Sequence, residues 1–202
     1  MNDIRAIIFD HGGVITNDLD KILIQDIADK FQLSYSDALN IINELVQPYQ
    51  KGTISDKEFW KQFSEKSGKK LPNNYASLWI DKYATEVIDQ RVIDLIKKLK
   101  NSGYIIALLS NTIPPHARIN QKHGFFNLFD PIILSFEVGT RKPEEKIYQI
   151  MLKKLNLPPN KCVFIDDKKE YADAALKIGI HGLVFDSYEK LVDELNRLDI
   201  NI

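Results

Sequence analysis

The chain has 202 residues, of which 44% are hydrophobic, and its 27 basic and 28 acidic side chains leave a formal net charge of −1. This length accommodates one large domain, or one domain with a small insertion, around a sizeable core. The near-neutral charge excludes a basic field for nucleic acid and a polybasic membrane patch, and no apolar stretch approaches the ~18 residues of a membrane span.

Cysteine content and the N-terminal segment both bear on location. The single cysteine, Cys162, excludes an internal disulfide, and we interpret it as a small buried side chain at the start of a strand. The first apolar stretch is interrupted by Asp10 and is too short for a signal peptide. We therefore expect a soluble cytoplasmic protein.

The first predicted element is a short apolar strand over residues 6–9 that ends at Asp10. A carboxylate at the carboxyl end of a buried parallel strand points into the crevice where open α/β sheets bind ligands. Such a carboxylate can act as a nucleophile or bind a hard cation, and Gly12 and Gly13 let the backbone approach a ligand closely. For Asp10 taken alone, a turn or helix-capping role is the alternative.

Residues 18–83 carry helical patterns only. Ser34 with Asp37, and Ser55 with Glu58, are typical of helix starts ahead of apolar positions at helical spacing. Because this block leaves the sheet directly after Asp10, we expect a small all-helical cap above the crevice. The cap comprises residues 17–84, and the α/β core comprises residues 1–16 and 85–202. Aromatic side chains of the cap are expected in its core.

The remaining chain returns to the core through a helix containing Val92 and Leu99, and then alternates strands with helices. The expected strands cover residues 104–109, 131–135, 162–165 and 182–185. The expected helices begin at Pro114 and Pro143 and span residues 172–178 and 188–198. This alternation predicts an α/β fold, a Rossmann-like doubly wound parallel sheet with helices on both faces.

Polar side chains follow three further elements at the same predicted edge of the sheet. Ser110 and Asn111 end the second strand and suit a phosphate, although an ordinary helix cap is the alternative. Lys142 precedes a helix and could neutralise a phosphate and a carboxylate together, unless it is simply solvated. Asp166 and Asp167 suit Mg²⁺, with a solvent-facing acid pair at a helix start as the alternative. Together with Asp10, these groups supply what phosphoryl transfer requires.

These motifs resemble those of the haloacid dehalogenase superfamily, in particular its phosphatases with a small helical cap. The resemblance covers essentially the whole chain and is carried by residues 7–10, 109–111, 141–143 and 164–167. Residues 52–55 with Phe59, and residues 141–148, are similar to the branch that includes bacterial α-D-glucose-1-phosphate phosphatases. The resemblance implies an Mg²⁺-dependent phosphatase for a small phosphorylated metabolite, with a sugar phosphate as a candidate.

The same resemblance implies roles for individual residues. Asp10 would be the nucleophile that forms an aspartyl-phosphate. Ser110 would hold the phosphate with support from Asn111, and Lys142 would steady the nucleophile and the transferring group.

The resemblance also implies a metal site. Mg²⁺ would bind Asp10, the main-chain carbonyl of Gly12 and Asp167, and Asp166 would act behind these ligands or through water. In the cap, Tyr49 and Gln50 are candidates for contact with substrate, as is Lys51.

Gly12 is a departure from the superfamily pattern. Most of its phosphatases carry an aspartate there that protonates the leaving group, although the resembling branch often has glycine; losing such an acid costs about 10²–10⁴-fold. His11 is an alternative proton carrier, but strand alternation should point it away from the side chain of Asp10. His116 could line the crevice, but we expect it at a helix surface.

Two other functions stay open at this point. A metal-free 2-haloacid dehalogenase would use Asp10 to attack carbon, but the acid pair at 166 and 167 argues against it. Gly12 also allows a catalytically impaired binding or regulatory protein with the same fold. The physiological substrate, the oligomeric state and the motion of the cap are not determined by the sequence.

Overall fold

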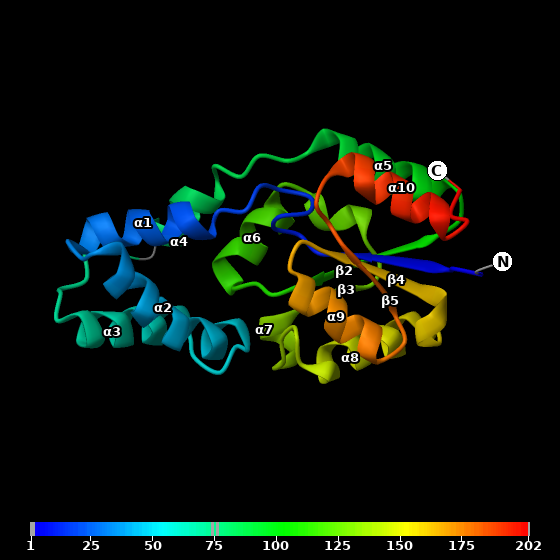
Figure 1. Cartoon of the computed structure of the whole chain (residues 1–202). Helices are drawn as coiled ribbons and strands as arrows, with labels where there is room; N and C mark the ends of the chain where they lie inside the picture. The colour runs from blue at the N-terminus through cyan, green and yellow to red at the C-terminus, as the bar shows by residue number, and fades with distance from the viewer. Residues whose placement is uncertain (1–2, 74, 76, 202) are drawn as a thin grey trace.

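The computed structural model of the chain describes residues 3–73, 75 and 77–201. At its centre is a five-stranded sheet in the order β3-β2-β1-β4-β5, and every neighbouring pair is parallel (Figure 1). The strands are β1 (Ala6–Phe9), β2 (Ile105–Ser110), β3 (Ile132–Leu134), β4 (Cys162–Asp166) and β5 (His181–Val184). The predicted Rossmann-like sheet is confirmed, and β1 lies in its middle.

Helices cover both faces of this sheet, which explains why its central strands are apolar at every position. Ile7 and Phe9 pack on the face covered by α5 and α10, whereas Ala6 and Ile8 pack on the face covered by α8 and α9. The helices of this part are α5 (Gln90–Asn101), α6 (Pro114–Lys122), α7 (Ser135–Val138), α8 (Glu145–Leu155), α9 (Lys169–Lys177) and α10 (Tyr188–Arg197). Short 3-10 helices span Phe125–Leu128 and Pro159–Lys161.

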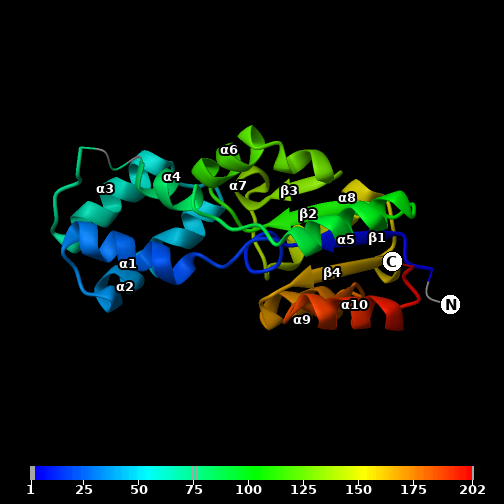
Figure 2. The same cartoon turned by 90° about the horizontal axis from the view of Figure 1, so that it is seen from above.

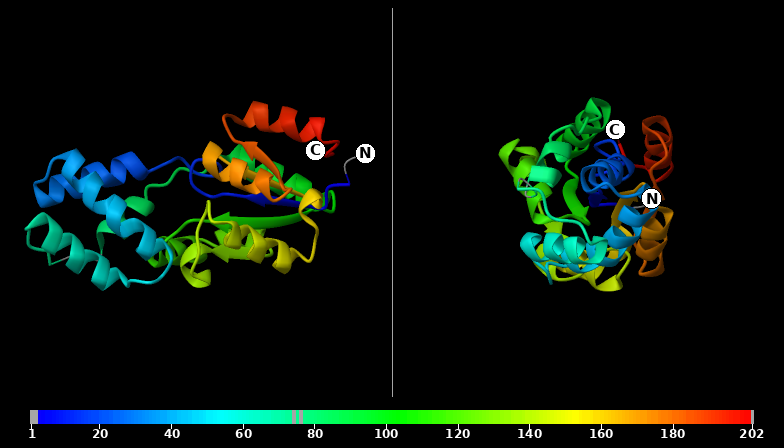
Figure 3. Two further views of the ribbon diagram at one scale, coloured as in Figure 1. Left: turned by 60° about the horizontal axis from the view of Figure 1, so that its bottom comes forward. Right: turned by 90° about the vertical axis from the view of Figure 1, so that its left-hand side faces the viewer.

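A second group of helices lies beyond the carboxyl ends of the strands (Figures 1 and 2). It consists of α1 (Asp20–Phe31), α2 (Tyr35–Gln50), α3 (Asp56–Ser67) and α4 (Ser77–Tyr83), here called the helical unit. The helical unit has its own apolar core, in which Trp60 and Phe63 are fully buried. In the left view of Figure 3 the helical unit lies at one end of the molecule, and α4 and α2 contact α6 and α7 of the sheet part.

The predicted helix starts of this unit are confirmed. The Ser34 hydroxyl accepts a hydrogen bond from the backbone N–H of Asp37 at 3.0 Å. Ser55 and Glu58 form a capping box, in which each side chain accepts from the other residue's backbone N–H. Each such cap satisfies a donor that the first helical turn leaves without a partner.

Some boundaries differ from the prediction. β3 ends at Leu134, because Ser135 begins α7, a helix of four residues that is too short to show helical periodicity. α9 begins at Lys169 rather than Ala172, and its first two residues, Lys169 and Glu170, are charged and carry no apolar signal. Within the described ranges, none of the helices has the length and apolar character needed to cross a membrane.

Candidate active site

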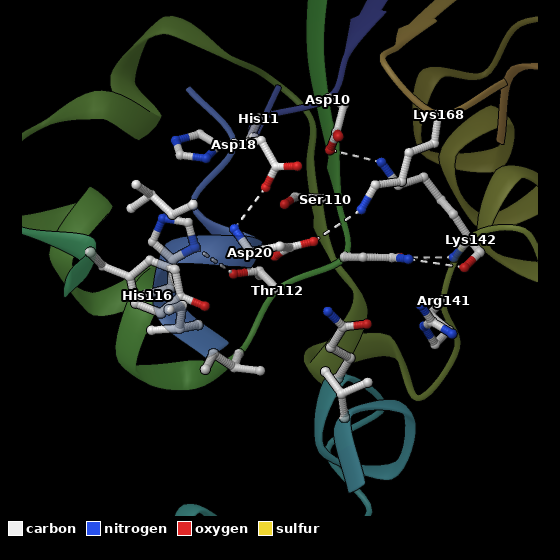
Figure 4. Close-up of a pocket in the computed structure, with 18 of the residues that line it drawn as sticks. Asp10, His11, Asp18, Asp20, Ser110, Thr112, His116, Arg141, Lys142 and Lys168 are labelled. Atoms are coloured by element: carbon white, nitrogen blue, oxygen red, sulfur yellow. Dashed lines mark hydrogen bonds and ion pairs between the residues drawn. The ribbon is translucent and has the colours of Figure 1, made fainter. Parts of the chain in front are cut away.

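The carboxyl ends of the three central strands bring the predicted polar residues together. Asp10 directly follows β1, Ser110 ends β2 and Asp166 ends β4. Because β1 pairs with both β2 and β4, these residues lie side by side at one edge of the sheet. A cavity of about 290 Å³ lies between this edge and the helical unit, and Asp10, Ser110, Lys142 and Asp167 line it. Figure 4 shows the first three of these residues.

Lys142 is fully buried and holds two carboxylates at once. Its Nζ lies 2.7 Å from Oδ1 of Asp10 and 2.6 Å from Oδ2 of Asp166. Burial by itself would lower the pKa of Lys142, but the two carboxylates outweigh it and the pKa is raised. The lysine therefore stays an ammonium, and it can neutralise negative charge where Asp10 meets a ligand. A solvated lysine, the alternative from the sequence, is not what the structure shows.

Asn111 fixes the backbone that carries this lysine. Its Nδ2 donates to the carbonyl oxygen of Lys142 at 2.9 Å, and its Oδ1 accepts from the N–H of Lys142 at 2.8 Å. Both ends of the amide are thus used to position Lys142 relative to β2. A role for Asn111 at the phosphate stays a prediction, and its positioning of Lys142 is an additional finding.

Asp10, Asp166 and Asp167 form an acidic cluster in which one oxygen from each lies within 4.8 Å of the others. Burial raises the pKa of Asp166 to about 7, with Asp10 adding to the rise and Lys142 opposing it. Burial and Asp10 also raise the pKa of Asp167. Three carboxylates around one ammonium leave negative charge that a divalent cation would neutralise.

The surroundings of Asp167 also fit a cation. Within the described part of the chain, its buried Oδ1 has no hydrogen-bond partner. Gly13 has φ +80°, and a Cβ at this position would lie 2.5 Å from Cγ of Asp167, so glycine lets the turn pack against the carboxylate. Asp166 is already engaged, since its oxygens accept from Lys142 and from the N–H of Lys168. The residues present therefore fit a hard divalent ion held by oxygen ligands.

A second polar cluster lines the same cavity on the side away from Lys142 (Figure 4). Nε2 of His116 lies 2.9 Å from Oε1 of Glu86, and its ring stacks on Tyr83 with centroids 3.9 Å apart. His116 is buried, so the surface position expected for it is wrong. His11 is also buried, and its ring contacts those of Phe125 and His116. Sequence analysis missed Glu86, because nothing in its local pattern marks it.

The helical unit supplies the remaining wall of the cavity. Aliphatic and aromatic side chains stand beside polar ones there: Leu23, Ile24, Ile42, Val46 and Trp79, with Asn43, Tyr49 and Gln50. Lys51, the third candidate from the cap, instead pairs with Glu144 at 2.5 Å. The cavity thus has a charged end at the sheet and a mixed end at the helices.

Comparisons with known proteins identify the family of the chain. Residues 4–179 match the family model of the haloacid dehalogenase-like hydrolases. The chain is 30% identical over 182 residues to a sesquiterpene phosphatase of Aspergillus oryzae, covering 89% of this chain and 88% of that protein. It is also 30% identical over 179 residues to a D-ribitol-5-phosphate phosphatase of Bacteroides thetaiotaomicron, covering 81% and 83%.

Solved structures show the same fold. A predicted hydrolase of this type from Porphyromonas gingivalis has a TM-score of 0.82 and 25% identity, covering 99% of this chain and 100% of its own. An enzyme of the family from Bacteroides thetaiotaomicron, in complex with magnesium and inorganic phosphate, has a TM-score of 0.74 and 26% identity, covering 93% and 98%.

Proposed function

The chain belongs to the haloacid dehalogenase-like hydrolases and is a phosphoric monoester hydrolase, and from this premise we propose that it hydrolyses a small phosphorylated metabolite through an aspartyl-phosphate on Asp10. The observation that carries the mechanism is the position of Lys142. Lys142 is a fully buried ammonium shared by Asp10 and Asp166, and beside it Oδ1 of Asp167 has no hydrogen-bond partner among the described residues; burying these charges is costly unless a ligand neutralises them.

In the first step, an oxygen of Asp10 attacks phosphorus while the bond from phosphorus to the leaving oxygen breaks; the leaving oxygen keeps the electron pair and takes a proton from water, because position 12 is glycine. In the second step, water attacks the phosphorus of the aspartyl-phosphate, which releases phosphate and regenerates the carboxylate. Lys142 neutralises charge on the transferring group in both steps, and Ser110 lies at the end of β2 where its hydroxyl can donate to a phosphate oxygen.

We propose Mg²⁺ as the cofactor, held by Asp10, Asp167 and the main-chain carbonyl of Gly12. Asp166 would lie behind these ligands or contact the ion through water. Bound there, the ion would supply electrostatic stabilisation of the phosphoryl group. The acidic cluster and the related magnesium complex support this assignment. The acidic cluster argues against a metal-free dehalogenase, because three carboxylates at one place favour a bound cation.

We propose different roles for the core and the cap. Residues 1–16 and 85–202 would form the catalytic core, and residues 17–84 would form a cap that encloses the substrate. The polar groups of the cap wall suit a sugar phosphate, which is our first candidate. The aliphatic side chains of α1 and α2 favour a second candidate, a phosphate ester with an apolar organic part.

A panel of phosphorylated metabolites and an activated aryl phosphate, each assayed with Mg²⁺ and with a chelator, tests this proposal. We expect phosphate release that the chelator stops, and we expect Asp10→Asn to abolish it while the fold stays intact. Asp173→Asn, an exposed acid on α9, serves as the matched control. Turnover that persists in Asp10→Asn would falsify the nucleophile. Phosphate binding without turnover, with activity gained in Gly12→Asp, would instead favour a binding protein.

A further inference from the structure

The second polar cluster of the cavity has the composition and geometry of a metal site. It is made by His11, Glu86 and His116, which we call the histidine cluster. One ligand atom from each of these residues lies within 4.8 Å of the others. Oε1 of Glu86 lies 2.9 Å from Nε2 of His116 and 4.0 Å from Nδ1 of His11. The three come from the end of β1, the segment after α4 and helix α6, so the fold brings them together.

His11 supplies an independent observation that points to a ligand. It is 2% exposed, and among the described residues neither of its ring nitrogens has a hydrogen-bond partner. Buried polar atoms without partners are rare and costly, and packing against Phe125 gives no reason for an imidazole in place of an apolar ring. These two buried ring nitrogens are therefore available to a ligand, and His11 lines the cavity.

We propose that the histidine cluster binds a d-block divalent cation such as Zn²⁺, at a position separate from the acidic cluster. Two imidazoles with one carboxylate are the donor set of many zinc sites with an open position, whereas Mg²⁺ prefers oxygen ligands. The acidic cluster offers oxygen donors alone. The two clusters therefore select different ions by the chemistry of their donors.

Neighbouring side chains hold the imidazole of His116 in a binding orientation. Oγ1 of Thr112 lies 3.3 Å from its Nδ1, which leaves Nε2 directed at Glu86. Tyr83 stacks on the ring in a nearly parallel arrangement, with an interplanar angle of 4°. Such outer contacts fix the ring orientation of metal-binding histidines and raise metal affinity.

The open position of this site faces the cavity, since all three residues of the histidine cluster line it. An ion bound there would meet a water molecule or an oxygen of the compound in the cavity. The site does not depend on turnover at Asp10, so its test is independent of the proposed phosphatase activity.

Co²⁺ is the probe, because four-coordinate Co²⁺ absorbs visible light with high intensity. The full-length protein, saturated with Mg²⁺, is titrated with Co²⁺ and then with Zn²⁺. We expect one equivalent of Co²⁺ with an intense band that Zn²⁺ displaces. Glu86→Gln and His116→Gln should each weaken Co²⁺ affinity by roughly 10–100-fold or abolish it. His11→Gln should do the same, provided that circular dichroism shows it to be folded.

Two controls make the test specific. His123→Gln removes an exposed histidine next to α6, and Asp167→Asn alters the acidic cluster; both should keep the band. The proposal is overturned if the folded wild type takes up no Co²⁺ under these conditions. It is equally overturned if Glu86→Gln and His116→Gln bind Co²⁺ like the wild type, or if Asp167→Asn abolishes the band.

Discussion

Gly12 and Gly13 are adjacent residues that tolerate a side chain to very different degrees. A Cβ on Gly12 would have no neighbouring atom within 4 Å. A Cβ on Gly13 would overlap the carboxylate of Asp167, and the substituted residue would have to keep the left-handed φ of +80°. Gly13→Ala should therefore displace Asp167 and lower Mg²⁺ affinity by roughly 10–100-fold, the range seen when the surroundings of metal ligands are disturbed. Gly12→Ala keeps the main-chain carbonyl and is the matched control. Calorimetric titration measures the Mg²⁺ affinity of both variants. Equal affinities would contradict the assignment of Asp167 as an Mg²⁺ ligand.

Lys142 allows a prediction about stability. Lys142→Met removes the ammonium and leaves the buried carboxylates of Asp10 and Asp166 without their partner. Breaking a buried ion pair in this way costs about 3–5 kcal/mol, so the free energy of unfolding should fall by that amount. Lys146→Met, at an exposed position of α8, should change it by less than about 0.5 kcal/mol. Urea unfolding in the presence of a chelator measures the free energy of unfolding of both variants. Similar values for Lys142→Met and Lys146→Met would show that the buried ion pairs contribute little to stability.

At the scale of elements, the loop between α2 and α3 docks on the core. Gly52 has φ +67°, and a Cβ there would overlap the carbonyl oxygen of Phe136 in α7. Gly68, which ends α3 with φ +66°, has open space around the same position. Alanine at either site should cost about 1–3 kcal/mol for the left-handed backbone. Gly52→Ala should in addition loosen the loop from α7.

Hydrogen exchange at residues 51–54 separates these two effects. We expect faster exchange in Gly52→Ala than in Gly68→Ala, because the contact with α7 is lost in the first variant alone. If the helical unit closes over the cavity, Gly52→Ala should also raise the KM for substrate. Equal exchange in the two variants would show that the docking contact does not hold the loop.

Elements were predictable from the sequence where a local signal exists. Ser55 and Glu58 identify the start of α3 through their mutual capping, and the uninterrupted apolar residues of β1 and β4 indicate burial on both faces. α7 was missed because four residues carry no periodicity. The position of Lys142 was predicted, but its burial was not, since the ion pairs that make burial tolerable come from distant segments.

At the scale of the whole molecule, parallel topology is what made the acidic cluster predictable. Parallel strands all end at one edge of a sheet, so Asp10 and Asp167 were expected at the same edge, and the pairing of β1 with β4 makes them neighbours. The histidine cluster follows no such rule. Glu86 and His116 meet because α4 packs against α6, and this contact between the helical unit and the core has no signature in either segment.

The acidic cluster also joins the ends of β1 and β4, so its cation should stabilise the entire fold. Mg²⁺ at 100 times its dissociation constant should raise the free energy of unfolding by about 2.7 kcal/mol, provided that the unfolded chain binds it weakly. For a chain of this size, that corresponds to a rise in Tm of roughly 5–10 °C. Asp167→Asn should lose most of this increment, because it removes one of the carboxylates that face the ion. Thermal unfolding is measured with Mg²⁺, and with a chelator plus NaCl at equal ionic strength, to give the rise in Tm that Mg²⁺ causes. An equal rise in the wild type and in Asp167→Asn would show that the ion binds elsewhere.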